Sequence, residues 1–143
     1  MTPTEKYKLS LAGEFGVCSE LSKKGYLASL TFGNCKSIDI IVSNENSSNI
    51  FLSIEVKATR SNKFVTNFFK KYITPSTSHP DYWVFVHINE NDISRFFILT
   101  HEEVAELQMI RNKMTVWEHH IGVDSLEIKS LLIHENRWDK IKF

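Results

Sequence analysis

The sequence predicts an α/β fold with a mixed central sheet of about five strands flanked by helices. A helix-spaced apolar pattern over residues 6–24 precedes three short strand-like runs over 26–32, 37–42 and 50–57. The loops between these runs are too short for crossovers, so the three strands should form an antiparallel meander. A helical pattern over 62–73 separates the third strand from a continuous apolar strand at 81–88. A right-handed crossover through that helix would make these two strands parallel.

The chain has the size of one domain. Its 143 residues suit a single core, which usually takes about 100–200. We divide residues 1–143 into a core at about 6–100 and a C-terminal helical extension at about 101–143. The balance of 17 Lys+Arg against 17 Asp+Glu argues against a non-specific nucleic-acid binder with a large basic field, but it allows a local basic site. No signal peptide or membrane span is visible, so we expect a cytoplasmic protein without a membrane partner.

The first helix carries an acid within its apolar stripe. Leu11, Phe15, Cys18 and Leu21 recur at helical spacing. Glu14 comes three residues after Leu11 and four before Cys18, so it falls within the same stripe. A carboxylate that faces a core is costly unless something compensates for it. Glu14 is therefore a candidate functional residue.

Turn and capping signals bound the first elements. Gly25 is placed to end the first helix, and Gly33-Asn34 is a hairpin signal between the first two strands. Ser61 is the expected N-cap of the helix at 62–73. We expect the apolar stripe of that helix to be core, with members Val65, Phe68, Phe69 and Tyr72 beside Phe64.

The C-terminal third gives weaker signals. A strand at 95–99 leads to Thr100 and Glu103, which form a capping box that opens another helix. A further short helix is expected over 124–132. Trp138 is the expected packing anchor of the last segment.

Charged residues break the apolar pattern of the second and third strands. Because side chains alternate along a strand, Glu55 and Lys57 share one face of the third strand, and Asp39 lies on the charged face of the second. Two neighbouring carboxylates favour a cation between them, and Mg²⁺ suits carboxylate and water oxygens with substrate phosphate. Lys57 would orient an attacking water and offset transition-state charge. Glu14 would join as an outer ligand or through water.

This arrangement resembles the PD-(D/E)XK nuclease superfamily, which has the restriction-endonuclease-like fold. The shared features are Glu14 on a first helix, Asp39 on a strand, and Glu55-Val56-Lys57 on the next strand. The similarity covers roughly the first 100 residues and includes the strand at 81–86. It implies an αβββαβ core and an endonuclease-like, divalent-metal phosphodiester hydrolase that uses Mg²⁺ or Mn²⁺.

The resemblance also implies residue roles. Asp39, Glu55 and the backbone carbonyl of Val56 would hold the metal, and Lys57 would be the catalytic base or position the water. Glu14 matches the helical acid that many members have. Ile38 stands where the pattern's Pro would be, which is a departure at a variable position of the superfamily.

Four basic residues follow the Glu-x-Lys strand: Arg60, Lys63, Lys70 and Lys71. They are either a solvated helix face or phosphate contacts beside the metal, and both interpretations stay open. The expected partner is nucleic acid, with DNA favoured over RNA. Cutting both strands would need a homodimer, and a separate partner would supply sequence recognition.

Two other functions compete with the nuclease. The chain is alternatively a catalytically silent member of the same fold that serves as a nucleic-acid-binding or protein-assembly module. It is alternatively an unrelated α/β domain in which Glu55 and Lys57 form a surface ion pair of little energetic value. A register that sends Asp39 and Glu55 to opposite faces of the sheet would establish the last alternative.

Overall fold

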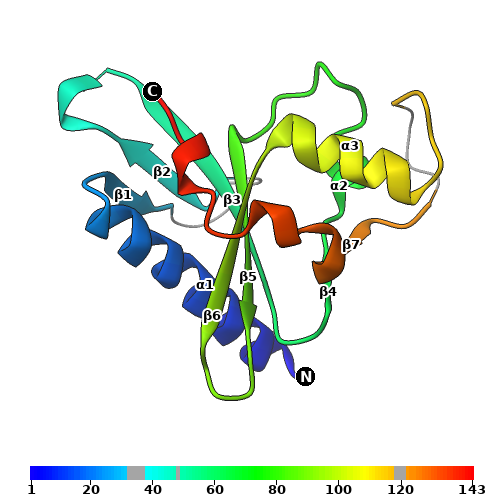
Figure 1. Cartoon of the computed structure of the whole chain (residues 1–143), viewed down its shortest axis with the longest axis horizontal. Helices are drawn as coiled ribbons and strands as arrows, with labels where there is room; N and C mark the ends of the chain where they lie inside the picture. Colours follow the sequence, from blue (N-terminus) through cyan, green and yellow to red (C-terminus); the bar gives the residue numbers. More distant parts are fainter. Residues whose placement is uncertain (32–37, 48, 118–121) are drawn as a thin grey trace.

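Five strands form the central sheet of the protein, in the order β1-β2-β3-β5-β6 (Figure 1). The computed structural model describes residues 1–31, 38–47, 49–117 and 122–143. The strands are β1 (Leu27–Leu30), β2 (Ile40–Ser43), β3 (Phe51–Thr59), β5 (Tyr82–Ile88) and β6 (Ser94–Thr100). The expected Gly33-Asn34 turn lies outside the described residues.

The pairing of the strands confirms the expected mixed sheet. β1, β2 and β3 pair antiparallel, with Ile40 of β2 opposite Ile54 of β3. β3 and β5 pair parallel, with Val56 opposite Val84, and β6 returns antiparallel to β5. The three-strand meander and the parallel crossover pair are therefore both present.

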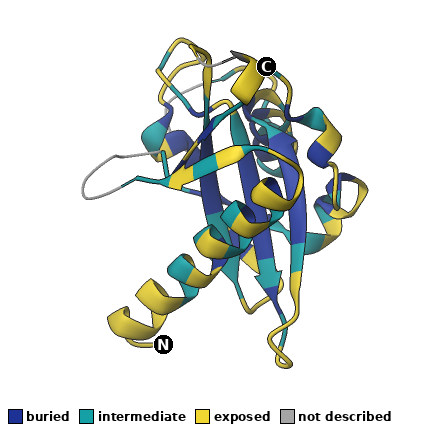
Figure 2. Cartoon of the chain, turned by 90° about the vertical axis from the view of Figure 1, so that its left-hand side faces the viewer, coloured by how far each residue is buried: buried dark blue, intermediate teal, exposed yellow. Residues whose placement is uncertain are grey.

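Helix α1 (Pro3–Lys23) covers one face of the sheet (Figure 2). It begins earlier than expected because Thr2 and Glu5 form a capping box, and it ends before Gly25, whose φ of 90° suits glycine. Its buried line is Gly13, Val17 and Leu21. A Cβ at Gly13 would lie 2.8 Å from the Cβ of Ala58. The glycine therefore lets the helix approach β3 closely.

The position of this buried line corrects the expected apolar stripe. Phe15 is 58% exposed, and Leu11, Glu14 and Cys18 are half-buried. The stripe was wrong because the close approach at Gly13 rotates the buried side of α1 away from Phe15. Glu14 consequently lies at the margin between the helix and the sheet, and not in the middle of the apolar contact.

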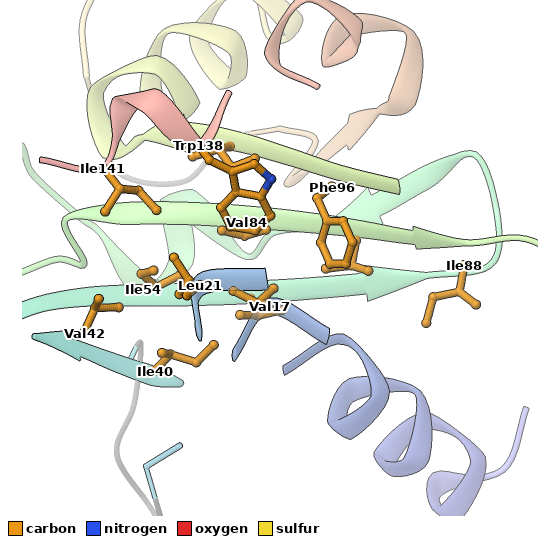
Figure 3. Packing of buried hydrophobic residues seen from close by; sticks show 13 residues of the cluster. Val17, Leu21, Ile40, Val42, Ile54, Val84, Ile88, Phe96, Trp138 and Ile141 are labelled. Carbon is orange, nitrogen blue, oxygen red and sulfur yellow. The ribbon is translucent and has the colours of Figure 1, made fainter. Parts of the chain in front are cut away.

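The core lies on both faces of the sheet. On the α1 face, Val17 and Leu21 pack with Ile54, Val84 and their neighbours (Figure 3). Trp138 and Ile141 from the C-terminal segment close this cluster, so the expected anchor role of Trp138 is confirmed. The opposite face packs a mostly aromatic cluster that includes Phe64, Phe68, Phe69, Tyr72, Trp83, Phe85 and Phe97.

The expected helix at 62–73 was wrong. Residues Lys63–Val65 form β4, which pairs antiparallel with β7 (Ser125–Glu127), and only Phe68–Lys71 form a short helix, α2. The Ser61 hydroxyl accepts a hydrogen bond from the Lys63 amide at 3.3 Å, and so it turns the chain without capping a helix. The expected core stripe is nevertheless buried, except Val65, which is 58% exposed.

The C-terminal third is less helical than expected. The Thr100–Glu103 capping box does open a helix, α3 (His101–Arg111). The helix expected over 124–132 was wrong, because β7 pairs with β4 there and 3-10 turns follow at Ile128–Ser130, Leu132–His134 and Trp138–Lys140. Among the described residues, no helix is long and apolar enough to cross a membrane.

Candidate active site

The candidate site lies where β2 stops pairing with β3. Ile40 is the first residue of β2 in the ladder, and the Asp39 amide before it donates to the Ile54 carbonyl at 2.9 Å. The Asp39 carboxylate then accepts a hydrogen bond from the Val56 amide at 2.8 Å. The Asp39 side chain thus accepts the hydrogen bond that a backbone carbonyl of a neighbouring strand would otherwise accept from β3. Because the N–H and C=O of one residue point to the same side of a strand, the Val56 carbonyl faces this edge as well.

Glu55 is the most buried charged group at the site. Its side chain is 2% exposed, and it lies on the sheet face opposite α1. Tyr72 donates a hydrogen bond to its Oε2 at 2.7 Å. Its Oε1 lies 2.6 Å from the Lys71 ammonium and 3.3 Å from the Lys57 ammonium. Burying a carboxylate is tolerable here because two cations and a phenol surround it.

Asp39 connects Glu55 to Glu14. Continuing the β2–β3 register by one residue puts Asp39 opposite Glu55, so the register does not separate the two acids. Burial raises the pKa of Asp39, the Val56 amide opposes that rise, and the charge of Glu55 adds to it. The three carboxyl groups therefore follow one another across the edge of the sheet, from α1 to the Tyr72 side.

Glu14 has the largest resolved pKa shift among these carboxyl groups. Burial first, and then the charge of Asp39 and a hydrogen bond with the Asp39 carboxyl, together raise its pKa from the usual 4.5 to about 7. Two carboxyl groups in hydrogen-bond contact favour a shared proton or a cation between them.

Lys57 is the polar partner of this carboxylate row. It leaves β3 on the same face as Glu55, and its side chain is 21% exposed. Burial lowers its pKa, the neighbouring Lys71 charge lowers it too, and the Glu55 charge opposes both. A lysine with a lowered pKa gives up its proton more readily at neutral pH.

The donor set fits a small hard cation. Mg²⁺ commonly takes one or two carboxylates and completes its shell with water and phosphate. Asp39, Glu55 and the Val56 carbonyl supply oxygens at one edge, with Glu14 behind Asp39. In the described part of the chain, no three His, Cys, Asp or Glu side chains converge tightly enough to form a ready-made metal cage.

The other basic residues predicted for the site separate into two groups. Lys71 belongs to the site because its ammonium contacts Glu55. Arg60 donates to the Asn89 carbonyl and to Asp92 at 2.9 and 3.0 Å. Lys63 and Lys70 are exposed and contact none of the site carboxylates.

Sequence reasoning missed the role of Tyr72. Its place in an apolar stripe predicted core, and its ring is indeed buried, yet its hydroxyl holds Glu55. The sequence did contain a signal, because the hydroxyl of a buried tyrosine usually forms a hydrogen bond with a polar partner.

Neither the comparison with protein-family models nor the comparison with curated proteins finds a match to this chain.

Proposed function

We propose that this protein is a divalent-metal-dependent phosphodiester hydrolase that acts on nucleic acid, with DNA favoured over RNA, and that its sheet belongs to the restriction-endonuclease-like fold. One observation carries the proposal. Asp39, Glu55 and Lys57 meet at the edge of β3 that β2 leaves, and Glu14 backs Asp39 from α1. This is the order and strand context on which the resemblance rests.

Each side chain has a distinct task in this proposal. Asp39 and Glu55 hold the metal with the Val56 carbonyl, and Glu14 supports Asp39. When bound, Mg²⁺ or Mn²⁺ polarises the phosphoryl oxygen and lowers the pKa of a bound water. Lys57 would position an attacking water or accept its proton, since the pKa of Lys57 is lowered and Glu55 holds its ammonium in place.

Lys71, the last residue of α2, and Tyr72, its C-cap, support Glu55. Tyr72 fixes the orientation of the carboxylate. Lys71 compensates the charge of the Glu55 carboxylate. A metal ion held by Glu55 would compete with Lys71 for the same oxygen.

The test uses plasmid, linear and branched DNA with Mg²⁺ or Mn²⁺. The informative variants are Asp39→Asn, which keeps an acceptor for the Val56 amide, and Lys57→Met, which keeps the apolar stem. We expect each to reduce cleavage by at least about 100-fold. Lys129→Met is the matched control, because that lysine is 80% exposed in the 3-10 turn Ile128–Ser130 after β7. Equal residual activity in the wild type and both site variants would refute the proposal.

A specific observation favours one alternative, a catalytically silent module of the same fold. Glu55 Oε1 already has two lysine ammonium groups within 3.3 Å, so its charge is compensated without a metal. The silent module predicts no heat of Mn²⁺ binding in calorimetry. The hydrolase predicts a binding isotherm that Asp39→Asn weakens.

The assembly of the active form is a separate part of the proposal. A single site cuts one strand, so cleavage of both strands would use a homodimer, and a separate partner would supply sequence recognition. Light scattering with and without DNA measures the oligomeric state.

A further inference from the structure

A groove of about 720 Å³ opens beside the candidate site, between the start of α1 and the end of β3. One wall consists of Lys6, Leu9 and Ser10 of α1, and the other runs from Lys57 through Arg60 to Lys63 of β4. The N-terminal half of α1 is largely exposed and extends past the sheet (Figure 2). The groove therefore lies along a part of the helix that the core does not use.

The charge of the groove has one sign. Lys6, Lys57, Arg60 and Lys63 contribute to its lining, and none of its lining residues is Asp or Glu. Among the described residues, neither Lys6 nor Lys63 has an ion-pair partner. The chain as a whole has a formal net charge of zero. Lys57 and Arg60 have their own carboxylate partners, Glu55 and Asp92. The cations of the lining that are free to attract an anion are therefore Lys6 and Lys63. Unpaired cations in a concave surface attract anions locally, even in a neutral protein.

The groove is continuous with the site through Lys57. That lysine lines the groove and also contacts Glu55 at 3.3 Å. A ligand in the groove that contacts Lys57 would consequently lie next to the site carboxylates. The neighbouring pocket, in contrast, includes Glu5 and Asp92 in its lining and so lacks this uniform charge.

The chemistry of the lining favours a phosphate backbone over bases. The aromatic ring at the groove, Phe64, is 1% exposed and is not available for stacking. The remaining polar groups include hydroxyls of Ser10, Thr59 and Ser61. Ammonium and hydroxyl donors bind phosphate oxygens and carry no base sequence information.

We propose that this groove binds the phosphodiester backbone of the DNA strand presented to the site, with Lys6 and Lys63 contacting phosphates next to the one that is cut. This inference rests on the proposed hydrolase function, and it adds the path of the substrate. It assigns a role to Lys6. Of the four basic residues predicted to contact phosphate, it keeps Arg60 and Lys63, which line the groove.

The test is fluorescence anisotropy with labelled single-stranded and duplex DNA in EDTA, where no cleavage occurs. The variant carries Lys6→Glu and Lys63→Glu. The control carries Lys113→Glu and Lys142→Glu, which change the net charge equally at exposed lysines that have no ion pair among the described residues. Lys113 comes just after α3 and Lys142 comes just before the last residue. Both of these parts of the chain lie away from the start of α1 (Figure 1).

We expect the groove variant to bind at least about tenfold more weakly than the wild type, and the control less than about threefold more weakly. The slope of log K against log salt should fall by about 1.4 to 1.8 for the groove variant, since each of the two phosphate contacts contributes about 0.7 to 0.9. Equally weakened DNA binding in both variants would overturn the groove proposal, because the change in net charge alone would then explain the loss of affinity. Absence of DNA binding by the wild type would overturn it too.

A second measurement needs no substitution. Acetylation of lysines in the folded protein, followed by mass spectrometry, should show Lys6 and Lys63 protected by DNA and Lys113 unprotected. Equal modification with and without DNA would contradict the groove. If the wild type cleaves DNA and the groove variant binds DNA as tightly as the wild type, the groove proposal alone is rejected. If DNA binds through the groove but no metal-dependent cleavage occurs, the hydrolase proposal alone is rejected.

Discussion

Replacing Glu14 by Gln is expected to stabilise the metal-free protein at pH 8 and to weaken its binding of divalent cations. In the folded protein the pKa of Glu14 is raised from 4.5 to about 7, chiefly by burial and then by Asp39. The ionised carboxylate is therefore disfavoured in the native state. Glutamine resembles the protonated carboxyl, because it can still donate a hydrogen bond to Asp39 and carries no charge.

The size of the effect follows from the pKa shift. Each pKa unit corresponds to 1.36 kcal/mol, so a rise from 4.5 to about 7 costs at most about 3.4 kcal/mol. Glu14 is only half-buried, and solvent screening reduces the expected gain in the free energy of unfolding to roughly 1–2 kcal/mol. A gain of that size should raise the melting temperature by roughly 3–8 °C.

The gain depends on pH in a defined direction. Because the folded pKa lies above the unfolded value, the native state of the wild type binds more protons between pH 4.5 and about 7. Wild-type stability therefore falls as the pH rises through this window. Below pH 4.5 both states are protonated, so Glu14→Gln should match the wild type there. The difference should reach its full size above about pH 7.

Urea unfolding in EDTA at pH 4.5 and at pH 8 measures this difference. Glu106→Gln is the control, since Glu106 is an exposed glutamate on α3. Excess Mg²⁺ at pH 8 should then stabilise the wild type more than Glu14→Gln, because a cation beside Asp39 would make the ionised Glu14 carboxylate favourable in the native state. A variant that is no more stable than the wild type at pH 8, or equally stabilised at both pH values, would refute the reasoning.

Two further predictions concern the packing of α1 and the support of Glu55. Gly13→Ala should destabilise the fold by roughly 1–3 kcal/mol in urea unfolding, since the new methyl group would lie 2.8 Å from Ala58, whereas Gly16→Ala, with 3.4 Å to its nearest neighbour, should cost far less. Equal costs would contradict the close approach of α1 to β3. Tyr72→Phe should cost about 1–3 kcal/mol, because Glu55 loses a buried donor at 2.7 Å. A stability equal to the wild type's would show that this hydrogen bond contributes nothing.

Strand periodicity was enough to bring the candidate site residues together from the sequence. Alternation puts Glu55 and Lys57 on one face, and a short antiparallel connection limits the registers that place Asp39 near them. The observed pairing of Ile40 with Ile54 is one of those registers. These relations are local, since a few residues of strand pattern determine them.

The error at 62–73 has the opposite origin. The aromatic residues at 64, 68, 69 and 72 are buried, as helical spacing predicted, but Lys63–Val65 pairs with Ser125–Glu127 about 60 residues later. A local pattern carries no information about such a distant partner. The position of Lys71 depended on the same segment, so its contact with Glu55 was out of reach of the sequence.

The hydrogen bond from the Val56 amide to Asp39 gives this acid a structural role at the edge of β3, in addition to its place in the candidate site. A substitution that removes the side-chain acceptor altogether, such as Asp39→Ala, also leaves a strand-edge amide unsatisfied, so it should harm folding, whereas Asp39→Asn should not. Loss of Lys57 or Glu14 carries no such penalty at the strand edge, and loss of Glu14 should even be stabilising. If the proposed hydrolysis were lost from a relative of this chain, Glu14 and Lys57 would therefore be expected to change first, and an acceptor at position 39 would be kept for the strand edge.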